Sequence, residues 1–316
     1  MNNEKKIVCI GITVLDILIS GIDEDIFKRV STDVEHIKCQ IGGDALNESV
    51  ILAALGHKSI LMGTVGNDMW GEYILKQLKL RGVDTDAVFV EPSLPTVVST
   101  VLVNTNGERN FLVSKKNSAA FDEKCLNYNV IESADAVSIG SVFYNGILDS
   151  HLKSILTLAK KNHALTFGDV SYRRGYTLDK AKEYLHLFDY LVPNFEEARG
   201  LTGEEKLESV ACRILDYGVK NVVIKMGEKG CYIQNAKGKI MVPAIKADHV
   251  VDTTGAGDSF LAGLIAGTLE GMDLEQAATF ANAAAAANVQ GLGATYLDSR
   301  EDVGKIWYSH RKMKGE

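Results

Sequence analysis

Short apolar runs alternate with longer stretches of helical periodicity along most of this 316-residue chain. Apolar runs of strand length occur at 7–11, 59–65, 137–139, 165–167, 190–192 and 222–225. Apolar residues recur with helical spacing over 47–55, 69–81, 148–162, 178–187, 207–217, 260–270 and 274–289. Strands that alternate with helices usually form a mostly parallel sheet with helices on both faces. We therefore predict a doubly wound α/β fold.

Two segments, at about 13–41 and 96–114, lack the helices that follow the other strands. Their residues favour strands and partly alternate between apolar and polar, and a Thr-Asn-Gly turn at 105–107 interrupts the second segment. We predict that both segments leave the main domain and form a small antiparallel sheet, which acts as a lid. Prolines are few and no Gly/Ser-rich linker is present, so residues 1–316 are predicted to form a single domain.

The composition is that of a soluble globular enzyme, with 46% hydrophobic and 24% charged residues. A net charge of −7 argues against nucleic acid as a partner, because a nucleic-acid surface needs a basic patch. No segment approaches the roughly 20 uninterrupted apolar residues that span a membrane. Lys5 and Lys6 precede an apolar run, but Asp16 interrupts it, so a buried strand explains this segment better than a signal peptide does.

The cysteines are odd in number and scattered, and none has Cys-x-x-Cys spacing; they occupy positions 9, 39, 125, 212 and 231. This pattern indicates neither a disulfide framework nor a zinc site. We therefore predict a cytoplasmic protein.

The most informative motif is VDTTGAGDSF at 251–260. Gly255, Ala256 and Gly257 let backbone amides approach an anion, and the unpaired amides and dipole at the start of a helix favour negative charge. Asp258 would repel a phosphate group there unless it takes a proton from the group that attacks the phosphate. We therefore predict a phosphoryl-transfer site with this turn as the anion hole and Asp258 as the base. The helix start should lower the pKa of Asp258. The alternative is an ordinary N-cap in a glycine-rich turn.

A second glycine-rich turn opens the predicted helix at 47–55. Gly43 lets a small ligand approach the backbone, and Asp44 and Asn47 offer polar groups to its hydroxyls. Asp16 follows the first strand, and open α/β sheets bind ligands beyond the carboxyl ends of their strands. We predict that these four residues bind substrate, with a solvated loop aspartate as the alternative for Asp16.

Three motifs in this order resemble those of the ribokinase-like, phosphofructokinase-B type carbohydrate kinases. They are GGxxxN at 42–47, PNFEE at 193–197 and DTTGAGD at 252–258. The resemblance extends from about residue 7 to about residue 302. It implies a doubly wound α/β domain with a small β-sheet lid over the sugar, and ATP-dependent phosphorylation of a sugar hydroxyl with Mg²⁺.

The resemblance also implies a nucleotide and magnesium site. Asn194 and Glu197 match the Asn-x-x-Glu motif of the family, in which the carboxylate acts on magnesium through water. A helix capping box is the alternative, and both can hold at once. Lys225, Gly227 and Gly230 follow a predicted strand and resemble the turn on the nucleotide side.

Further positions near the C-terminus resemble the adenine pocket and a monovalent-cation site of the family. Asn282 lies in the helix that resembles the side of the adenine pocket. The loop that contains Gly291 and Gly293, together with Asp252 and Thr254, resembles a site for K⁺ that is built largely from backbone carbonyls.

Three further features bear on the substrate. Arg109 lies in the predicted lid and would reach the substrate, or else is exposed. The segment FGDVSYR at 167–173 partly matches the Asp-Pro-Asn-x-Arg motif of fructokinases and 2-keto-3-deoxygluconate kinases. Arg173 could pair with a sugar carboxylate or an ATP phosphate, or could merely be exposed. Asp44 stands where ribokinases carry lysine. These features favour a ketose or a sugar acid over ribose.

Two alternative functions stay open. A nucleoside kinase of the same fold would stack a base beneath aromatic lid residues, of which Phe27 and Phe111 are the obvious candidates. A non-catalytic, sugar-binding regulator would not need the complete motif around Asp258. The expected partners are a small sugar and ATP, with neither nucleic acid nor a membrane. Lid sheets in this family often pair edge to edge, which suggests a homodimer.

Overall fold

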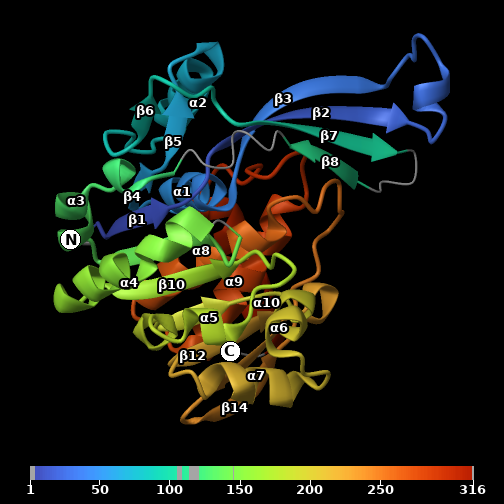
Figure 1. Cartoon of the computed structure of the whole chain (residues 1–316). Helices are drawn as coiled ribbons and strands as arrows, with labels where there is room; N and C mark the ends of the chain where they lie inside the picture. The colour runs from blue at the N-terminus through green and yellow to red at the C-terminus, as the bar shows by residue number, and fades with distance from the viewer. Residues whose placement is uncertain (1–3, 105–108, 114–120, 145, 315–316) are drawn as a thin grey trace.

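The computed structural model describes residues 4–104, 109–113, 121–144 and 146–314. Its larger sheet has eight strands in the order β14-β13-β12-β11-β10-β9-β1-β4, and all neighbours are parallel except β12–β13 and β13–β14 (Figure 1). The strands are β1 (Lys6–Ile10), β4 (Lys58–Met62), β9 (Ala136–Val142), β10 (Leu165–Val170), β11 (Tyr190–Val192), β12 (Asn221–Lys225), β13 (Cys231–Asn235) and β14 (Gly238–Val242). The predicted mostly parallel sheet is confirmed.

Helices cover both faces of this sheet. One group is α1 (Asp44–Ala54), α2 (Met69–Leu80), α8 (Ala256–Leu269), α9 (Leu274–Asn288) and α10 (Arg300–Lys314). The other is α3 (Tyr128–Glu132), α4 (Gly146–Lys161), α5 (Leu178–Ala181), α6 (Phe195–Thr202) and α7 (Leu207–Leu215). Successive residues of β1 alternate between the two cores, with Ile7 and Cys9 in one and Val8 and Ile10 in the other. In the described part of the chain, no helix combines the length and apolar character needed to cross a membrane.

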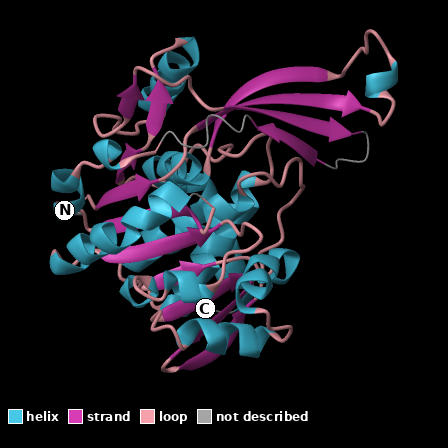
Figure 2. Cartoon of the chain, viewed as in Figure 1, coloured by secondary structure: helices cyan, strands magenta, loops and turns pink. Residues whose placement is uncertain are grey.

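A second sheet has four strands in the order β3-β2-β7-β8 and extends from one side of the main domain (Figure 2). Its strands are β2 (Val14–Ile22), β3 (His36–Gly42), β7 (Val98–Asn104) and β8 (Arg109–Val113). The prediction of an antiparallel sheet was wrong, because β2 and β7 pair in parallel, with Asp16 opposite Ser99. Both segments leave the main domain in the same direction, so their first strands run side by side and the sheet is mixed.

Two predicted elements are divided in the structure. The run at 59–65 becomes β4 and β5 (Thr64–Gly66), which leaves the main sheet at Gly63 and pairs with β6 (Phe89–Glu91). The helix predicted at 178–187 becomes α5 and the 3₁₀ turn η3 (Leu185–Leu187), and nothing in the sequence pattern marks this break. The other 3₁₀ turns are η1 (Ile26–Lys28), η2 (Glu123–Cys125) and η4 (Gly227–Lys229).

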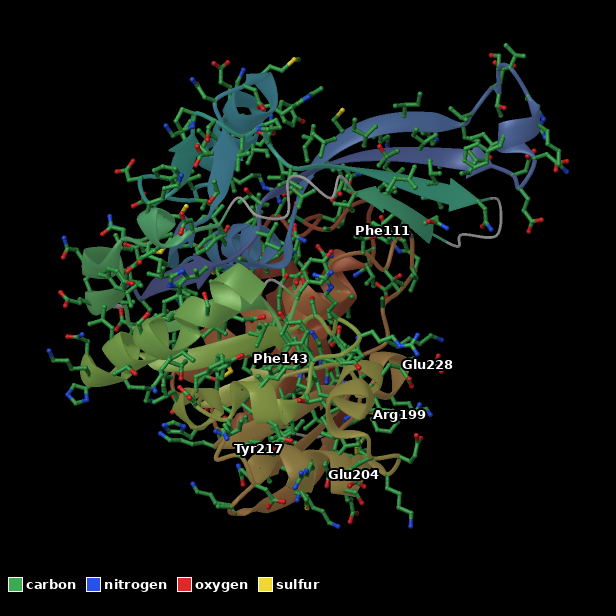
Figure 3. All side chains as sticks on the ribbon, viewed as in Figure 1. Phe111, Phe143, Arg199, Glu204, Tyr217 and Glu228 are labelled. Carbon is green, nitrogen blue, oxygen red and sulfur yellow. The ribbon has the colours of Figure 1, made fainter. Side chains whose placement is uncertain are left out.

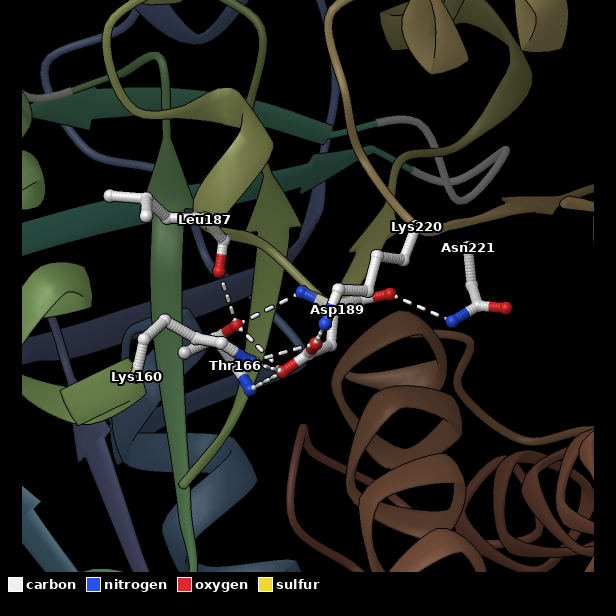
Figure 4. Close-up of polar contacts among 6 residues, drawn as sticks. All are labelled: Lys160, Thr166, Leu187, Asp189, Lys220 and Asn221. Atoms are coloured by element: carbon white, nitrogen blue, oxygen red, sulfur yellow. Dashed lines mark hydrogen bonds and ion pairs between the residues drawn. The ribbon is translucent and has the colours of Figure 1, made fainter. Parts of the chain in front are cut away.

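A buried carboxylate joins the starts of three parallel strands (Figure 4). Asp189 accepts hydrogen bonds from Lys160 Nζ at 2.6 Å and Lys220 Nζ at 2.8 Å, and from the backbone amide of Thr166 at 3.0 Å. Its carbonyl accepts a bond from Asn221 Nδ2 at 2.9 Å. Burial would raise the pKa of Asp189, but its bonds to the two lysines hold the pKa below the usual value. These contacts all lie at the amino ends of the strands. Open α/β sheets bind their ligands at the opposite, carboxyl ends.

Small residues bring α8 and α9 unusually close together. An added side-chain carbon at Gly263 would lie 2.8 Å from Ala281 Cα, and one at Gly267 would lie 3.0 Å from Ala277 Cα. The apolar α8 lies between the sheet and α9, so it is buried on nearly every side. The alanine run at 283–287 therefore belongs to a tightly packed helix pair.

The start of α1 rests directly on the ends of β1 and β9. An added side-chain carbon at Gly140 would lie 2.6 Å from the backbone nitrogen of Ala45, and one at Gly11 would lie 2.8 Å from Ala45 Cβ. Glycine at these two positions thus sets how close the first turn of α1 comes to the sheet.

We expect Gly140→Ala to lower the free energy of unfolding by about 1–3 kcal/mol, because the added methyl group would collide with the backbone of α1. Chemical denaturation measures this change. The control, Gly304→Ala in α10, places a methyl group 3.8 Å from Tyr308, an ordinary contact distance. It should stabilise the helix by up to about 1 kcal/mol. Equal losses in both variants would contradict the close packing of α1.

Candidate functional site

A cavity of about 660 Å³ lies between the four-stranded sheet and the carboxyl ends of the parallel strands. The four-stranded sheet contributes Asp16, Ser99 and Phe111, and Figure 3 labels Phe111 on the side of this sheet that faces the main domain. The main domain contributes the starts of α1 and α8 and the loops that follow β1, β9 and β10. The two glycine-rich motifs, distant in the sequence, therefore meet in one cavity.

Both helices that open into the cavity start directly after a glycine with positive φ. Gly43 (φ 104°) precedes α1 and Gly255 (φ 71°) precedes α8. Side-chain carbons there would lie 2.2 Å from Ile12 O and 2.1 Å from Ala294 O, so only glycine fits. The helices begin three or four residues earlier than the apolar periodicity predicted. The polar residues of their first turns face the cavity instead of the core, so they do not contribute to the apolar pattern.

Asp258 stands in the first turn of α8 and lines the cavity. Asn47 Nδ2 donates a hydrogen bond of 2.6 Å to Asp258 Oδ2, which joins the starts of α1 and α8. Burial and the negative charges of Asp44 and Asp169 raise the pKa of Asp258 well above its usual value. The expectation that the helix start would lower this pKa was therefore wrong, because burial and neighbouring carboxylates outweigh the helix dipole.

The predicted anion turn has its amides at the start of α8, which have no acceptor within the helix. The amide of Ala256 already donates to Thr253 O at 3.3 Å. A side-chain carbon added at Gly257 would lie 3.2 Å from Lys225 Nζ, so the ammonium group of this lysine lies next to the turn. The positive end of the helix dipole and the ammonium group of Lys225 therefore lie close together at this turn.

Lys225 is held by a buried partner that sequence reasoning missed. Its Nζ lies 2.6 Å from Asp169 Oδ1, and the two side chains are 15% and 4% exposed. Burial alone would lower the pKa of Lys225, but the charges of Asp169 and Glu197 raise it above the usual value. A carboxylate at the end of a buried apolar strand was the signal that could have identified Asp169.

Asn194 and Glu197 form a reciprocal capping box at the start of α6. Asn194 Oδ1 accepts from the Glu197 amide at 2.9 Å, and Glu197 Oε2 accepts from the Asn194 amide at 2.7 Å. Glu197 also lines the cavity, and burial raises its pKa to about 7. The structure therefore contains the capping box and still leaves Glu197 Oε1 outside that box.

Asp44 lines the cavity one helical turn before Asn47. Its Oδ2 accepts hydrogen bonds from Ser141 Oγ and from Ser171 Oγ, the latter at 2.8 Å. Ser141 has a backbone φ of 59°, a strained value for any residue other than glycine. Neither serine was predicted as a site residue, although Ser171 stands in the segment compared with Asp-Pro-Asn-x-Arg.

Asp16 lines the opposite wall of the cavity. A side-chain carbon at Gly42 would lie 2.2 Å from Asp16 Oδ2, so glycine at 42 makes room for this carboxylate. Burial raises the pKa of Asp16. Asp16, Gly43, Asp44 and Asn47 thus line the same cavity.

The predicted cation loop is also assembled. Asp252 Oδ1 accepts from the amide and hydroxyl of Thr254 at 2.9 and 2.7 Å, and Asp252 Oδ2 accepts from the Gly293 amide at 3.0 Å. A side-chain carbon at Gly291 would overlap the ring of Tyr296. These contacts join the segment before α8 to the loop after α9.

Four further predicted residues are not part of the cavity lining, namely Asn282, Gly227, Gly230 and Arg173. Asn282 is buried and donates to Pro243 O at 3.1 Å, which fixes the chain after β14. Gly227 and Gly230, both with positive φ, form the turn after β12. Arg173 is exposed. Arg109 is the first residue of β8 and pairs with Val103 of β7. The side chain of Arg109 lies outside the described residues.

Glu48 was missed entirely. It is fully buried next to Asn47, and Ser138 Oγ donates a hydrogen bond of 2.5 Å to its Oε2. Burial, followed by the charge of Asp169, raises its pKa well above the usual value. A charged residue inside the apolar run at 45–55 was the available signal.

The chain is similar to known proteins over nearly its whole length. Residues 4–301 match the family described as pfkB family carbohydrate kinase. A 2-dehydro-3-deoxygluconokinase from Bacillus subtilis (strain 168) is 30% identical over 270 residues, which cover 80% of this chain and 82% of that protein.

Solved structures are similar over a comparable extent. Arabidopsis thaliana ribokinase, complexed with ribose and ATP, is 26% identical, with a TM-score of 0.83 over 96% of this chain and 99% of that one. A protein from E. coli, in complex with ATP and Mg²⁺, is 25% identical, with a TM-score of 0.84 over 97% of this chain and 100% of that one. The likeness therefore includes both sheets and their helices.

We expect Lys225→Met to lower the free energy of unfolding by about 3–5 kcal/mol, because it leaves Asp169 buried without its cation. The double variant with Asp169→Asn should recover part of this loss. The control Lys239→Met breaks an ion pair with Glu208 whose side chains are both more than half exposed, and it should cost about 0–1 kcal/mol. Chemical denaturation measures all three variants, and equal losses in the two single variants would contradict the role of burial.

Proposed function

This chain belongs to the pfkB family of carbohydrate kinases and is an ATP-dependent carbohydrate kinase, and we propose that Asp258 is its catalytic base. The base would act on a hydroxyl of a ketose or of a sugar acid similar to 2-keto-3-deoxygluconate. The turn at 255–258 would serve as the anion hole. One observation carries the proposal: Asp258 stands beside the amides that start α8 and is bonded to Asn47, inside the cavity.

The proposed mechanism uses groups already in place. Asp16, Asp44 and Asn47 would bind sugar hydroxyls, and Asp258 would accept the proton of the attacking hydroxyl. Phosphoryl transfer passes through a loose transition state, so alignment and neutralisation of charge do most of the work. Amides of Gly257 and Asp258, with Lys225 behind them, would stabilise the oxygens of the transferred group.

ATP and magnesium fit the donors beside this turn. The related E. coli structure contains both ATP and Mg²⁺. Glu197 lines the cavity and has its Oε1 outside the capping box, so this carboxylate would act on magnesium through water, with the phosphates of ATP as further ligands. When bound, magnesium neutralises phosphate charge. Asn194, Lys225, Gly227, Gly230 and Asn282 would position the nucleotide.

The four-stranded sheet would act as the lid, with segments 13–41 and 96–114 closing over the sugar and Arg109 reaching toward it. Arg173 would contact the sugar or ATP from the main domain. Ile37 of β3 and Leu112 of β8 are 65% and 53% exposed on the edge strands, which supports a homodimer through this sheet. Analytical ultracentrifugation tests the dimer. Dependence on ATP supports a cytoplasmic location, which cell fractionation tests.

A potassium site is also proposed, at Asp252, Thr254, Gly291 and Gly293. The side chain of Asp252 is occupied by Thr254 and Gly293, which supports a site in which backbone carbonyls bind the ion. Equal turnover in potassium and tetramethylammonium salts would remove this proposal.

A nucleoside kinase is the second candidate function. Phe111, Phe121 and Tyr144 line the cavity and offer aromatic rings against which a base could stack. A non-catalytic regulator is not favoured by any contact in the cavity. ADP release with a panel of ketoses, sugar acids and nucleosides distinguishes these possibilities.

We expect Asp258→Asn to lower kcat by about 10²–10⁴-fold, because an amide cannot accept the proton of the hydroxyl. The KM for ATP should stay nearly unchanged, and the carbonyl oxygen of the new side chain can still accept the bond from Asn47. Coupled measurement of ADP release gives both constants, and Asp216→Asn on the exposed end of α7 is the control. Near-normal turnover would exclude Asp258 as the base.

Turnover should fall with acid at a higher pH than an ordinary aspartate would give. Asp258 works as the carboxylate, and its pKa is raised by burial and by Asp44, so protonation begins well above the usual value of about 3.9. Asp44→Asn removes a negative charge, lowers the pKa of Asp258 and should move the acid limb of kcat to lower pH. A kcat profile with the same acid limb in Asp44→Asn and in Asp216→Asn would contradict this coupling.

A further inference from the structure

The end of the cavity around Asp44 presents hydrogen-bond acceptors. Ser141 Oγ and Ser171 Oγ both donate to Asp44 Oδ2. A serine hydroxyl has a single proton to donate, so each serine has used its donor on Asp44. The two hydroxyls and the carboxylate therefore have only accepting capacity left for a ligand.

This arrangement is held in place by the backbone. Asp44 is fixed at the start of α1 by the close contact of Ala45 with Gly140. Ser141 follows Gly140 directly and takes φ 59°, which turns its hydroxyl to Asp44. Ser171 comes from the next strand of the sheet, just beyond the end of β10. Two neighbouring strands and one helix thus converge on a single carboxylate oxygen.

The charges around the cavity have the same character. Among the described lining residues, Asp16, Asp44, Glu197 and Asp258 carry carboxyl groups, and none is lysine, arginine or histidine. Lys225 lies beneath the phosphoryl end and is already paired with Asp169. The negative charge of Asp44 reaches Asp258 and raises its pKa, so Asp44 acts in a poorly screened environment.

We propose that Asp44, Ser141 and Ser171 select an uncharged sugar, whose hydroxyl groups donate to these acceptors, and disfavour sugar acids and sugar phosphates. This inference rests on the proposed function and narrows it to the neutral acceptor. A carboxylate or phosphate group is an acceptor at neutral pH and would meet only acceptors here. A sugar hydroxyl can instead donate a charge-assisted hydrogen bond to Asp44.

The same contacts act on the substrate before and during the reaction. Repulsion between an acidic substrate and Asp44 therefore weakens binding in both states and should raise KM more than it lowers kcat. The effect should persist in added salt, because the contact lies inside the cavity.

The test compares sugars that differ only at one end. D-fructose is matched with 2-keto-D-gluconate (carboxylate at C1) and with D-fructuronate (carboxylate at C6), and 3-deoxy-D-fructose is matched with 2-keto-3-deoxy-D-gluconate. The relevant acid is the one oxidised at the end that is not phosphorylated. We expect kcat/KM for the neutral member to exceed that for the acid by at least about tenfold, mainly through KM.

The variant Asp44→Asn replaces the carboxylate with an amide of nearly the same shape and keeps the contacts with the two serines. Asparagine Oδ1 can still accept from Ser141 and Ser171, while its Nδ2 offers a donor to a carboxylate. The preference for the neutral sugar should then fall to about threefold or less. Asp216→Asn, on the exposed end of α7, should keep the native preference.

The outcomes separate this inference from the proposed function. Higher kcat/KM for sugar acids in the native protein, or the same preference in Asp44→Asn as in the native protein, overturns the selection by Asp44 and leaves the sugar kinase intact. ADP release with nucleosides and with no sugar or sugar acid overturns the proposed acceptor class, and the inference falls with it.

Discussion

The hydrogen bond from Asn47 to Asp258 is the contact on which the site depends. It joins two helix starts that lie 211 positions apart in the chain, and each start follows a glycine whose φ only glycine adopts easily. Neither helix can shift without the other, because the glycine and alanine contacts pack both helices closely against their neighbours and the sheet. Acceptor-binding and phosphoryl-binding groups are thereby held in fixed relation by the core itself.

The second constraint is the imbalance of charge. Several carboxyl groups surround Lys225, which is 15% exposed and paired with Asp169. Further buried negative charge is costly, so the pKa values of Glu48 and Asp258 are both raised. The raised pKa favours the proposed role of Asp258, since a carboxylate with a raised pKa is a stronger base than an ordinary aspartate.

Much of the fold could be predicted because local signals and global architecture agree. Alternating strand and helix patterns predicted the parallel sheet, and the glycine turns predicted that a helix follows each of them, although both helices begin three or four residues earlier than expected. The direction of β7 could not be predicted, since strand pairing between distant segments has no local signature. The same holds for Asp169, Ser141 and Glu48, whose roles arise from contacts across elements, and for the pKa of Asp258, which depends on burial that no sequence pattern reports.

Asp44 connects acceptor choice to base strength. Its carboxylate accepts from Ser141 and Ser171, and its negative charge raises the pKa of Asp258. A change to a neutral or cationic residue would admit acidic sugars and, at the same time, weaken the base. A pocket that accepts acidic sugars would therefore need a different neighbour to sustain that pKa, or a deeper burial of the base. Specificity and catalysis cannot be tuned separately at this position.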